Sequence, residues 1–157
     1  MPPPLVKLKH IIDAIDSASD ELTSILDRQT GEVIVVFEAD LDFQEGDDID
    51  AAPEWQRPMI AALLAVREGF SDRYVRLPSK FEIHEWSILN DFGHSLEEPG
   101  PQQDVLDAIH SAGAFRRFRA VVTRHGLLDR WYAFKAGRCR ELALRWCERN
   151  RVEFDGG

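Results

Sequence analysis

A run of arginines within residues 113–119 is the segment whose residue types best suit the binding of a ligand. Arg116, Arg117 and Arg119 follow a glycine. A helix is predicted to begin there, with a core face formed by Phe115, Phe118 and Val122 at helical spacing. The free N–H groups of a helix N-terminus, together with guanidinium groups, suit phosphate or carboxylate. We therefore expect an anion-binding face. The alternative is a solvated helix face whose arginines pair with the acidic first half of the chain.

A second group of residues with binding potential follows shortly afterwards. Trp131, Tyr132 and Phe134 place three aromatics within four positions, and at helical spacing they cannot all face the core. Trp131 and Phe134 can share an inner face, which leaves Tyr132 at the margin. An exposed aromatic beside arginines can stack on a base or anchor a peptide, whereas the alternative is a rim aromatic that covers the core. The candidate binding residues are Arg116, Arg117, Arg119, Arg130, Trp131 and Tyr132.

The familiar templates for metal binding and catalysis fail on this sequence. A calcium loop of the EF-hand type starting at Asp40 needs Gly and Glu where the chain has Glu45 and Ala51. The zinc motif that His84 and Glu85 begin needs His where the chain has Ile88. No phosphate-binding or dinucleotide loop or nucleophile elbow occurs. We expect no metal, cofactor or catalytic residue, with a looser cation site on the acidic stretch and an enzyme with an unrecognised site as alternatives.

Charge is distributed unevenly along the 157 residues, whose net charge is −9. Residues 1–100 hold 8 Lys and Arg against 21 Asp and Glu, whereas residues 101–157 hold 11 against 7. An acidic protein repels polyanions, which disfavours nucleic acid as a partner, but the basic end keeps a local site open. Alternatively, the two parts complement each other inside one fold. Residues 38–54 hold eight carboxylates and no base, so we expect a solvated acidic loop, mobile over 42–52 and without bound metal.

The sequence also indicates a cytoplasmic, non-membrane protein. No apolar run approaches the ~20 residues that cross a bilayer, and charged residues interrupt the N-terminal segment where a signal core would lie. Cys139 and Cys147 fall in one predicted helix, ~12 Å apart along its axis, which is too far for a disulfide.

The first two thirds of the chain mix helices and strands. Residues 5–27 are predicted to hold one or two helices, but a strand near 23–27 is an open alternative. Residues 33–37 are the best strand, and 74–77 form a short one. A helix should begin near Glu54 and end at Gly69, with an apolar stripe that includes Trp55 and Phe70. Ser79 and Glu82 form a capping box for a helix through Ser95.

The last third is predicted to be helical. Pro99–Pro101 is predicted to be a linker, and Gly113 and Gly126 separate helices. The last helix, with an alternative break at Gly137, turns Trp146 inward. We therefore predict an α+β fold in one domain over 1–157, with a small antiparallel sheet, five or six helices and an alternative sub-layer boundary near 97–101.

Several short segments carry a resemblance to a known family. Residues 113–118, 129–134 and 143–146 resemble the bacterial Uncharacterised Protein Family 0158, and weaker matches lie at 30–33, 77–79 and 91–92. The resemblance spans about residues 28–150. It implies a small bacterial cytosolic protein, and it supplies no reaction and no catalytic or binding residue.

The function expected from these observations is a non-enzymatic binding or regulatory module that uses the arginine-rich helical face. Its partner would be a protein or another anionic ligand. A nucleic-acid-binding protein that uses the same face is the alternative.

Overall fold

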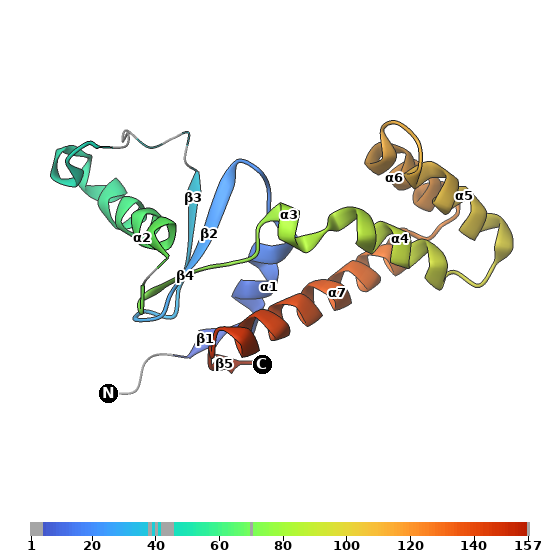
Figure 1. Cartoon of the computed structure of the whole chain (residues 1–157). Coiled ribbons are helices and arrows are strands. Elements are labelled where there is room, and N and C mark those ends of the chain that lie inside the picture. The colour runs from blue at the N-terminus through green and yellow to red at the C-terminus, as the bar shows by residue number, and fades with distance from the viewer. Residues whose placement is uncertain (1–4, 38, 40, 42–45, 70, 157) are drawn as a thin grey trace. The chain divides into compact units, whose positions relative to one another are not determined.

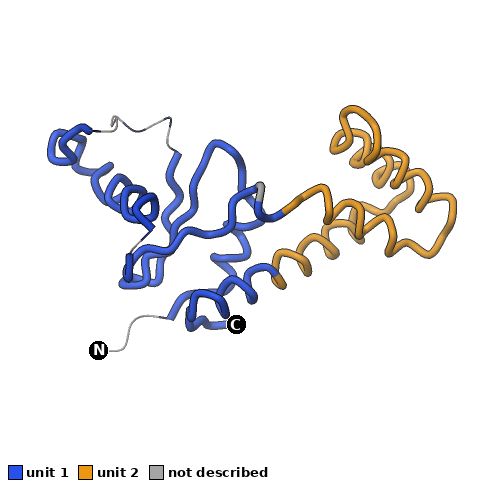
Figure 2. Tube along the Cα trace, in the orientation of Figure 1, with its two compact units in different colours: residues 1–83, 142–157 blue, residues 84–141 orange. Residues whose placement is uncertain are grey.

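The computed structural model describes residues 5–37, 39, 41, 46–69 and 71–156 (Figure 1). Helices and a small antiparallel sheet confirm the predicted α+β class. The chain divides into two compact units, residues 1–83 with 142–157 and residues 84–141 (Figure 2). That the whole chain is one domain stays a prediction. No helix of the described part is both long and apolar enough to cross a membrane.

The first unit is built around a three-stranded antiparallel sheet of order β3-β2-β4. Its strands are β2 (Leu22–Asp27), β3 (Val33–Phe37) and β4 (Tyr74–Arg76). The expected strand at 33–37 is confirmed, and the segment at 23–27 is a strand rather than a helix. Gly31, with a φ of 76°, supplies the left-handed residue of the hairpin turn.

Helix α2 (Arg57–Glu68) packs on one face of this sheet, after the 3-10 turns η2 (Ile49–Ala51) and η3 (Glu54–Gln56). Pro58 lies in its first turn, where a missing N–H is tolerated, and Gly69 ends it with a φ of 78°. The shared core consists of Ile25, Val36, Ala62 and Leu63. The expectation that Trp55 belongs to the apolar stripe is wrong: it lies in η3, before the helix, and is 67% exposed.

Parts of two expectations lie outside the described residues. Phe70, the last residue of the predicted stripe, is not described, and neither are residues 38, 40 and 42–45 of the predicted acidic loop. Within the described part of that loop, the Asp48 carboxylate accepts a hydrogen bond from the Asp50 N–H and caps η2. The segment is therefore not wholly irregular.

The remaining elements of the first unit come from the two ends of the sequence. Helix α1 (Leu8–Asp16) buries four apolar side chains. Strand β1 (Val6–Lys7) pairs in parallel with β5 (Phe154–Asp155). Trp146, near the end of α7 (Leu128–Arg149), is 4% exposed and donates its indole N–H to the Arg76 carbonyl at 3.1 Å. This matches the predicted inward orientation.

The capping box is confirmed, but the helix it begins is shorter than expected. The Ser79 hydroxyl accepts from the Glu82 N–H, and the Glu82 carboxylate accepts from the Ser79 N–H. Helix α3 (Lys80–Ile83) then stops at His84, whose φ of 53° interrupts the helical path before α4 (Glu85–Ser95). The single helix predicted through Ser95 is therefore two helices.

The second unit is helical, as predicted. It contains α4, α5 (Pro99–Ile109), α6 (Ala114–Arg124) and the first part of α7. Pro99–Pro101, expected to be a linker, forms the first turn of α5 instead, because proline fits the first helical positions. Helix α7 continues through Gly137 without a break.

Candidate functional site

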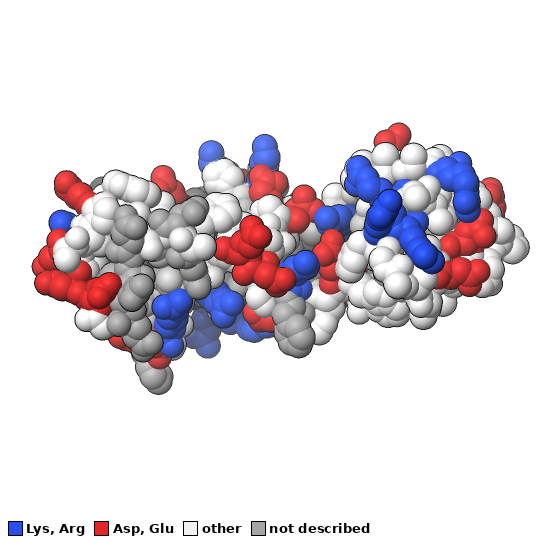
Figure 3. Space-filling view, turned by 90° about the horizontal axis from the view of Figure 1, so that it is seen from above, with Lys and Arg blue, Asp and Glu red and all other residues white. Residues whose placement is uncertain are grey.

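Helix α6 is the most basic element of the chain. It carries four arginines and no carboxylate, and the sequence has no Asp or Glu between Asp107 and Asp129. At the right of Figure 3, Lys and Arg side chains gather on the surface of the second unit, with acidic side chains beside them. The element therefore presents a local positive charge within an acidic protein.

The core packing of α6 divides its exposed side chains between two flanks. Phe118 and Val122 are buried and define the inner face. At ~100° per residue, Phe115, Arg116 and Arg119 lie on one side of that inner face. Arg117 and Arg124 lie on the other side, so the predicted arginine cluster is not a single surface.

One flank joins arginines to exposed aromatics. Arg119 donates a hydrogen bond from its guanidinium to the Tyr132 hydroxyl of α7 at 3.0 Å. Phe115 is 48% exposed and Tyr132 is 45% exposed. We call the group Phe115, Arg116, Arg119 and Tyr132 the Arg116 face.

The positive charge of the Arg116 face has no acidic partner in the part of the chain that the structure describes. The side chains of Arg116 and Arg119 are exposed, and neither forms an ion pair with another residue that the structure describes. The Arg119 contact with Tyr132 leaves most of its five N–H donors available. Exposed guanidinium groups with available N–H donors can bind carboxylates, and the neighbouring rings offer apolar and stacking contacts.

The opposite flank of α6 is neutralised by α5. Arg117 and Arg124 line a shallow hollow of about 320 Å³ together with Asp104 and Asp107. Asp104 accepts contacts from Arg124 at 3.3 Å and from His125 at 2.8 Å. The alternative was that Arg116, Arg117 and Arg119 pair with the acidic first half of the chain. Arg117 forms no ion pair among the described residues, and the partner of Arg124 is Asp104, which lies in the basic last part of the chain.

Two further candidates lie away from the Arg116 face. Trp131 is 7% exposed and packs edge to face against Phe92 and Phe118, with ring centroids 5.4 and 4.8 Å apart. Its ring belongs to the core, so it is not available to a partner. Arg130 is exposed, but at helical spacing it lies on the opposite side of Trp131 from Tyr132. The residue that the sequence analysis missed is Phe115, which was assigned to the core.

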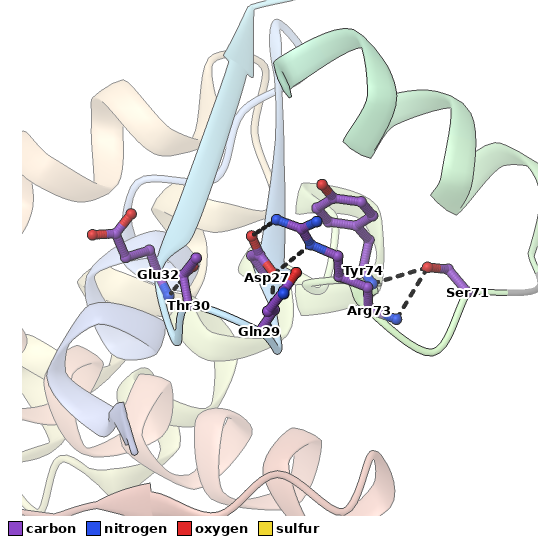
Figure 4. A network of polar contacts seen from close by, with 7 residues as sticks. All are labelled: Asp27, Gln29, Thr30, Glu32, Ser71, Arg73 and Tyr74. Carbon is purple, nitrogen blue, oxygen red and sulfur yellow. Dashed lines mark hydrogen bonds and ion pairs between the residues drawn. The ribbon is translucent and has the colours of Figure 1, made fainter. Parts of the chain in front are cut away.

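The first unit contains a separate polar cluster at one end of its sheet (Figure 4). Arg73 donates two hydrogen bonds to the Asp27 carboxylate, each at 3.0 Å, and the Gln29 N–H donates a third at 2.9 Å. Burial alone would raise the pKa of Asp27, but the bonds from Arg73 and Gln29 together hold that pKa below its usual value. The charged groups of this cluster are paired with one another. The cluster therefore links the turn after β2 to the residues just before β4, and it offers no unpaired acid or base for catalysis.

Neither metal ligation nor thiol chemistry finds support in the described part of the chain. No three His, Cys, Asp or Glu side chains lie together there in a metal-binding arrangement. Cys139 and Cys147 are buried and are not joined in a disulfide, and burial raises the pKa of the Cys147 thiol to about 11. At neutral pH this thiol is protonated, so it is a poor nucleophile.

Comparison with known proteins gives a family without an assigned activity. The model of an uncharacterised protein family, UPF0158, matches residues 1–156. The UPF0158 protein PA5073 of Pseudomonas aeruginosa is 27% identical over 114 residues, which cover 72% of each chain. No solved structure matches.

Proposed function

Since this chain belongs to the uncharacterised protein family UPF0158, which confirms the resemblance found in its sequence, we propose a function from its own surface. In this proposal, the protein is a non-enzymatic binding module that recognises an acidic segment of a protein partner through the Arg116 face. Cytoplasmic action is part of the proposal. It is supported by the two buried cysteines, which are not joined in a disulfide, as is typical of a reducing compartment.

The observation that carries the proposal is the combination, on one flank, of two half-exposed rings with two arginines that form no ion pair among the described residues. Arginine and aromatic residues are enriched among the residues that dominate protein interfaces. The hydrogen bond between Arg119 and Tyr132 holds one guanidinium in place before a partner arrives. A guanidinium that is already positioned loses less conformational entropy on binding.

A protein partner is favoured over nucleic acid by the charge of the whole chain. With a net charge of −9, the protein repels a polyanion at long range, whereas a short acidic segment needs only local charge. The run without carboxylates from residue 108 to 128 is what supports nucleic acid as the second candidate.

The test compares two double variants that remove equal charge. Arg116→Ser with Arg119→Ser alters the Arg116 face. Arg117→Ser with Arg130→Ser removes two exposed arginines that lie off it. Fluorescence anisotropy would follow a labelled peptide rich in Asp and Glu with one Leu-Trp pair. We expect the first variant to bind about tenfold more weakly and the second to bind nearly as well as wild type.

Two outcomes would contradict the proposal. Equal losses in both variants would mean that the peptide senses only the overall charge. Tighter binding of a single-stranded oligonucleotide, with a log–log salt slope of ~0.7 per phosphate contact, would favour nucleic acid instead. Denaturant unfolding serves as the folding control, because exposed substitutions usually change stability by less than ~0.5 kcal/mol.

A further inference from the structure

The two edges of the sheet in the first unit differ in how they are covered. At the β4 edge, the outward carbonyl of Arg76 accepts a hydrogen bond from the Trp146 indole. Strand β3 forms the other edge and pairs with no strand but β2 among the described residues. An uncovered edge strand is a template for pairing with another chain.

The hydrogen-bond register shows which backbone groups of β3 face outward. The Asp27 N–H donates to the Glu32 carbonyl, so the alternation of an antiparallel pair directs residues 34 and 36 toward β2 as well. The N–H and C=O groups of Val33, Val35 and Phe37 therefore point away from the sheet. These are the groups that an added strand would use.

The side chains along this edge are also suited to an added strand. Val35 is 39% exposed and Phe37 is 47% exposed. Val33 and Val35 line a groove of about 410 Å³ beside α1, whose other walls include His10 and Asp13. The opposite face of β3, with Val36, is already packed against α2. An added strand would thus find an apolar strip and an open groove on one face only.

Charge around the edge indicates the kind of occupant. Asp13 and Glu32 are exposed at the groove, and the sequence after β3 holds eight carboxylates and no base over residues 38–54. In antiparallel pairing with a second copy, Glu32, just before β3 of one copy, would face the acidic sequence that follows β3 of the other. Like charges opposite each other destabilise a strand pair.

From this edge and its charge we propose that β3 accepts an extended segment of another protein as a fourth strand, with alternating apolar residues and flanking Lys or Arg. Backbone hydrogen bonds would supply the pairing, and the groove beside α1 would receive alternate side chains. The flanking basic residues would meet Asp13 and Glu32. This site is independent of the Arg116 face and of the function proposed for it.

The test uses the synthetic peptide Lys-Lys-Val-Thr-Val-Thr-Val-Lys-Lys as the probe on the full-length protein. Val35→Pro removes an outward N–H, a change that edge strands tolerate, together with the valine side chain. Val35→Thr keeps the N–H and serves as the matched control for the change of side chain. We expect Val35→Pro to weaken binding about fivefold or more, the value of roughly one lost hydrogen bond. Val35→Thr should lose clearly less affinity than Val35→Pro, and the double variant of Arg116 and Arg119, which lies outside this site, should bind as wild type does.

Peptide variants test the same pairing without altering the protein, in case Val35→Pro fails to fold. N-methylation of one alternate set of peptide N–H groups should abolish binding, and methylation of the other set should not. Replacement of the lysines by glutamates should also abolish binding. Equal effects of the two methylated sets would overturn the proposal, as would equal binding of the glutamate peptide. Sedimentation that reveals a wild-type dimer lost in Val35→Pro would overturn it in favour of a second copy.

Discussion

At the scale of single residues, the Asp27 carboxylate shows how charge stabilises the sheet. It accepts hydrogen bonds from Gln29 in the turn after β2 and from Arg73 just before β4. Its side chain is 5% exposed, whereas that of Arg73 is 47% exposed. A buried carboxylate therefore accepts hydrogen bonds from a partly solvated guanidinium. Such a pair stabilises the fold more than a fully exposed ion pair does.

This arrangement predicts a loss of stability in acid. Because the pKa of Asp27 is lower in the folded chain than in the unfolded chain, its stabilising contribution is present above the unfolded pKa, about 4. It is lost as the pH falls through the folded value. Urea unfolding of wild type and Asp27→Asn from pH 7 to pH 2 would measure it. We expect a free-energy difference at pH 7 that shrinks in acid, and a constant difference would contradict this reading.

Trp146 offers a second prediction at this scale, because it combines burial with one hydrogen bond. Trp146→Ala should lower the free energy of unfolding by ~3–5 kcal/mol, since it leaves a large cavity. Trp146→Phe should cost ~1–3 kcal/mol, mainly because the Arg76 carbonyl loses its donor. Urea unfolding measures both, and a loss below ~1 kcal/mol for the alanine variant would contradict a core role.

The sequence predicted part of the candidate surface at this scale. Helical spacing correctly left Tyr132 exposed while Phe134 and Trp131 turned inward. The same reasoning failed for Phe115, because it assigned three aligned apolar positions of α6 to the core, whereas only Phe118 and Val122 are buried. The width of a buried stripe depends on the neighbouring helices, and spacing alone does not give it.

At the scale of elements, helices α6 and α7 end in the same way with different residues. Each has a residue of positive φ after the helix, Gly126 at 67° and Arg151 at 53°. In each, two backbone N–H groups reach back to the last turn, the pattern of a Schellman motif. The bonds run from Leu127 to Val122, from Gly126 to Thr123, from Val152 to Cys147 and from Arg151 to Glu148.

This comparison predicts opposite effects of two substitutions. Arg151→Gly should raise the free energy of unfolding by ~1 kcal/mol, because a left-handed conformation costs a residue with a Cβ that amount or more. Gly126→Ala should lower it by a similar amount, and no atom near the added Cβ would contribute a clash. Thermal and urea unfolding measure both variants, and a destabilised Arg151→Gly would reveal a contact of that side chain.

Elements with local signals were predicted well from the sequence, and those without them were not. The strand predicted from the β-branched residues of 33–37 is confirmed. The capping box predicted from Ser79 and Glu82 is confirmed by their reciprocal hydrogen bonds. The break at His84 carries no glycine or proline signal, so it was missed. Pro99–Pro101 gave an ambiguous signal, because proline both interrupts helices and begins them.

At the scale of the whole molecule, α7 contributes to both compact units. Residues 128–141 belong to the second unit and residues 142–149 to the first. Helix formation is cooperative along its length, so fraying in one part weakens the other. This continuity supports the prediction of one domain. The alternative boundary was expected near 97–101, whereas the division into units falls after residues 83 and 141.

We therefore predict that the two units unfold in one transition. The buried thiols report on them separately, since Cys139 belongs to the second unit and Cys147 to the first. Thiol alkylation at increasing urea, with mass spectrometry to locate the label, should give the same midpoint for both cysteines. Labelling of one cysteine at a clearly lower urea concentration would indicate that its unit unfolds independently.

The discontinuity of the first unit has a consequence for the order in which the protein is made. A ribosome releases residues 1–83 first and must synthesise all of residues 84–141 before the segment that completes that unit. Val6 cannot meet Phe154, and the Arg76 carbonyl cannot meet Trp146, until synthesis reaches residues 142–157. Nascent chains released early would expose the apolar residues that this segment covers, and quality-control proteases and chaperones recognise such surfaces.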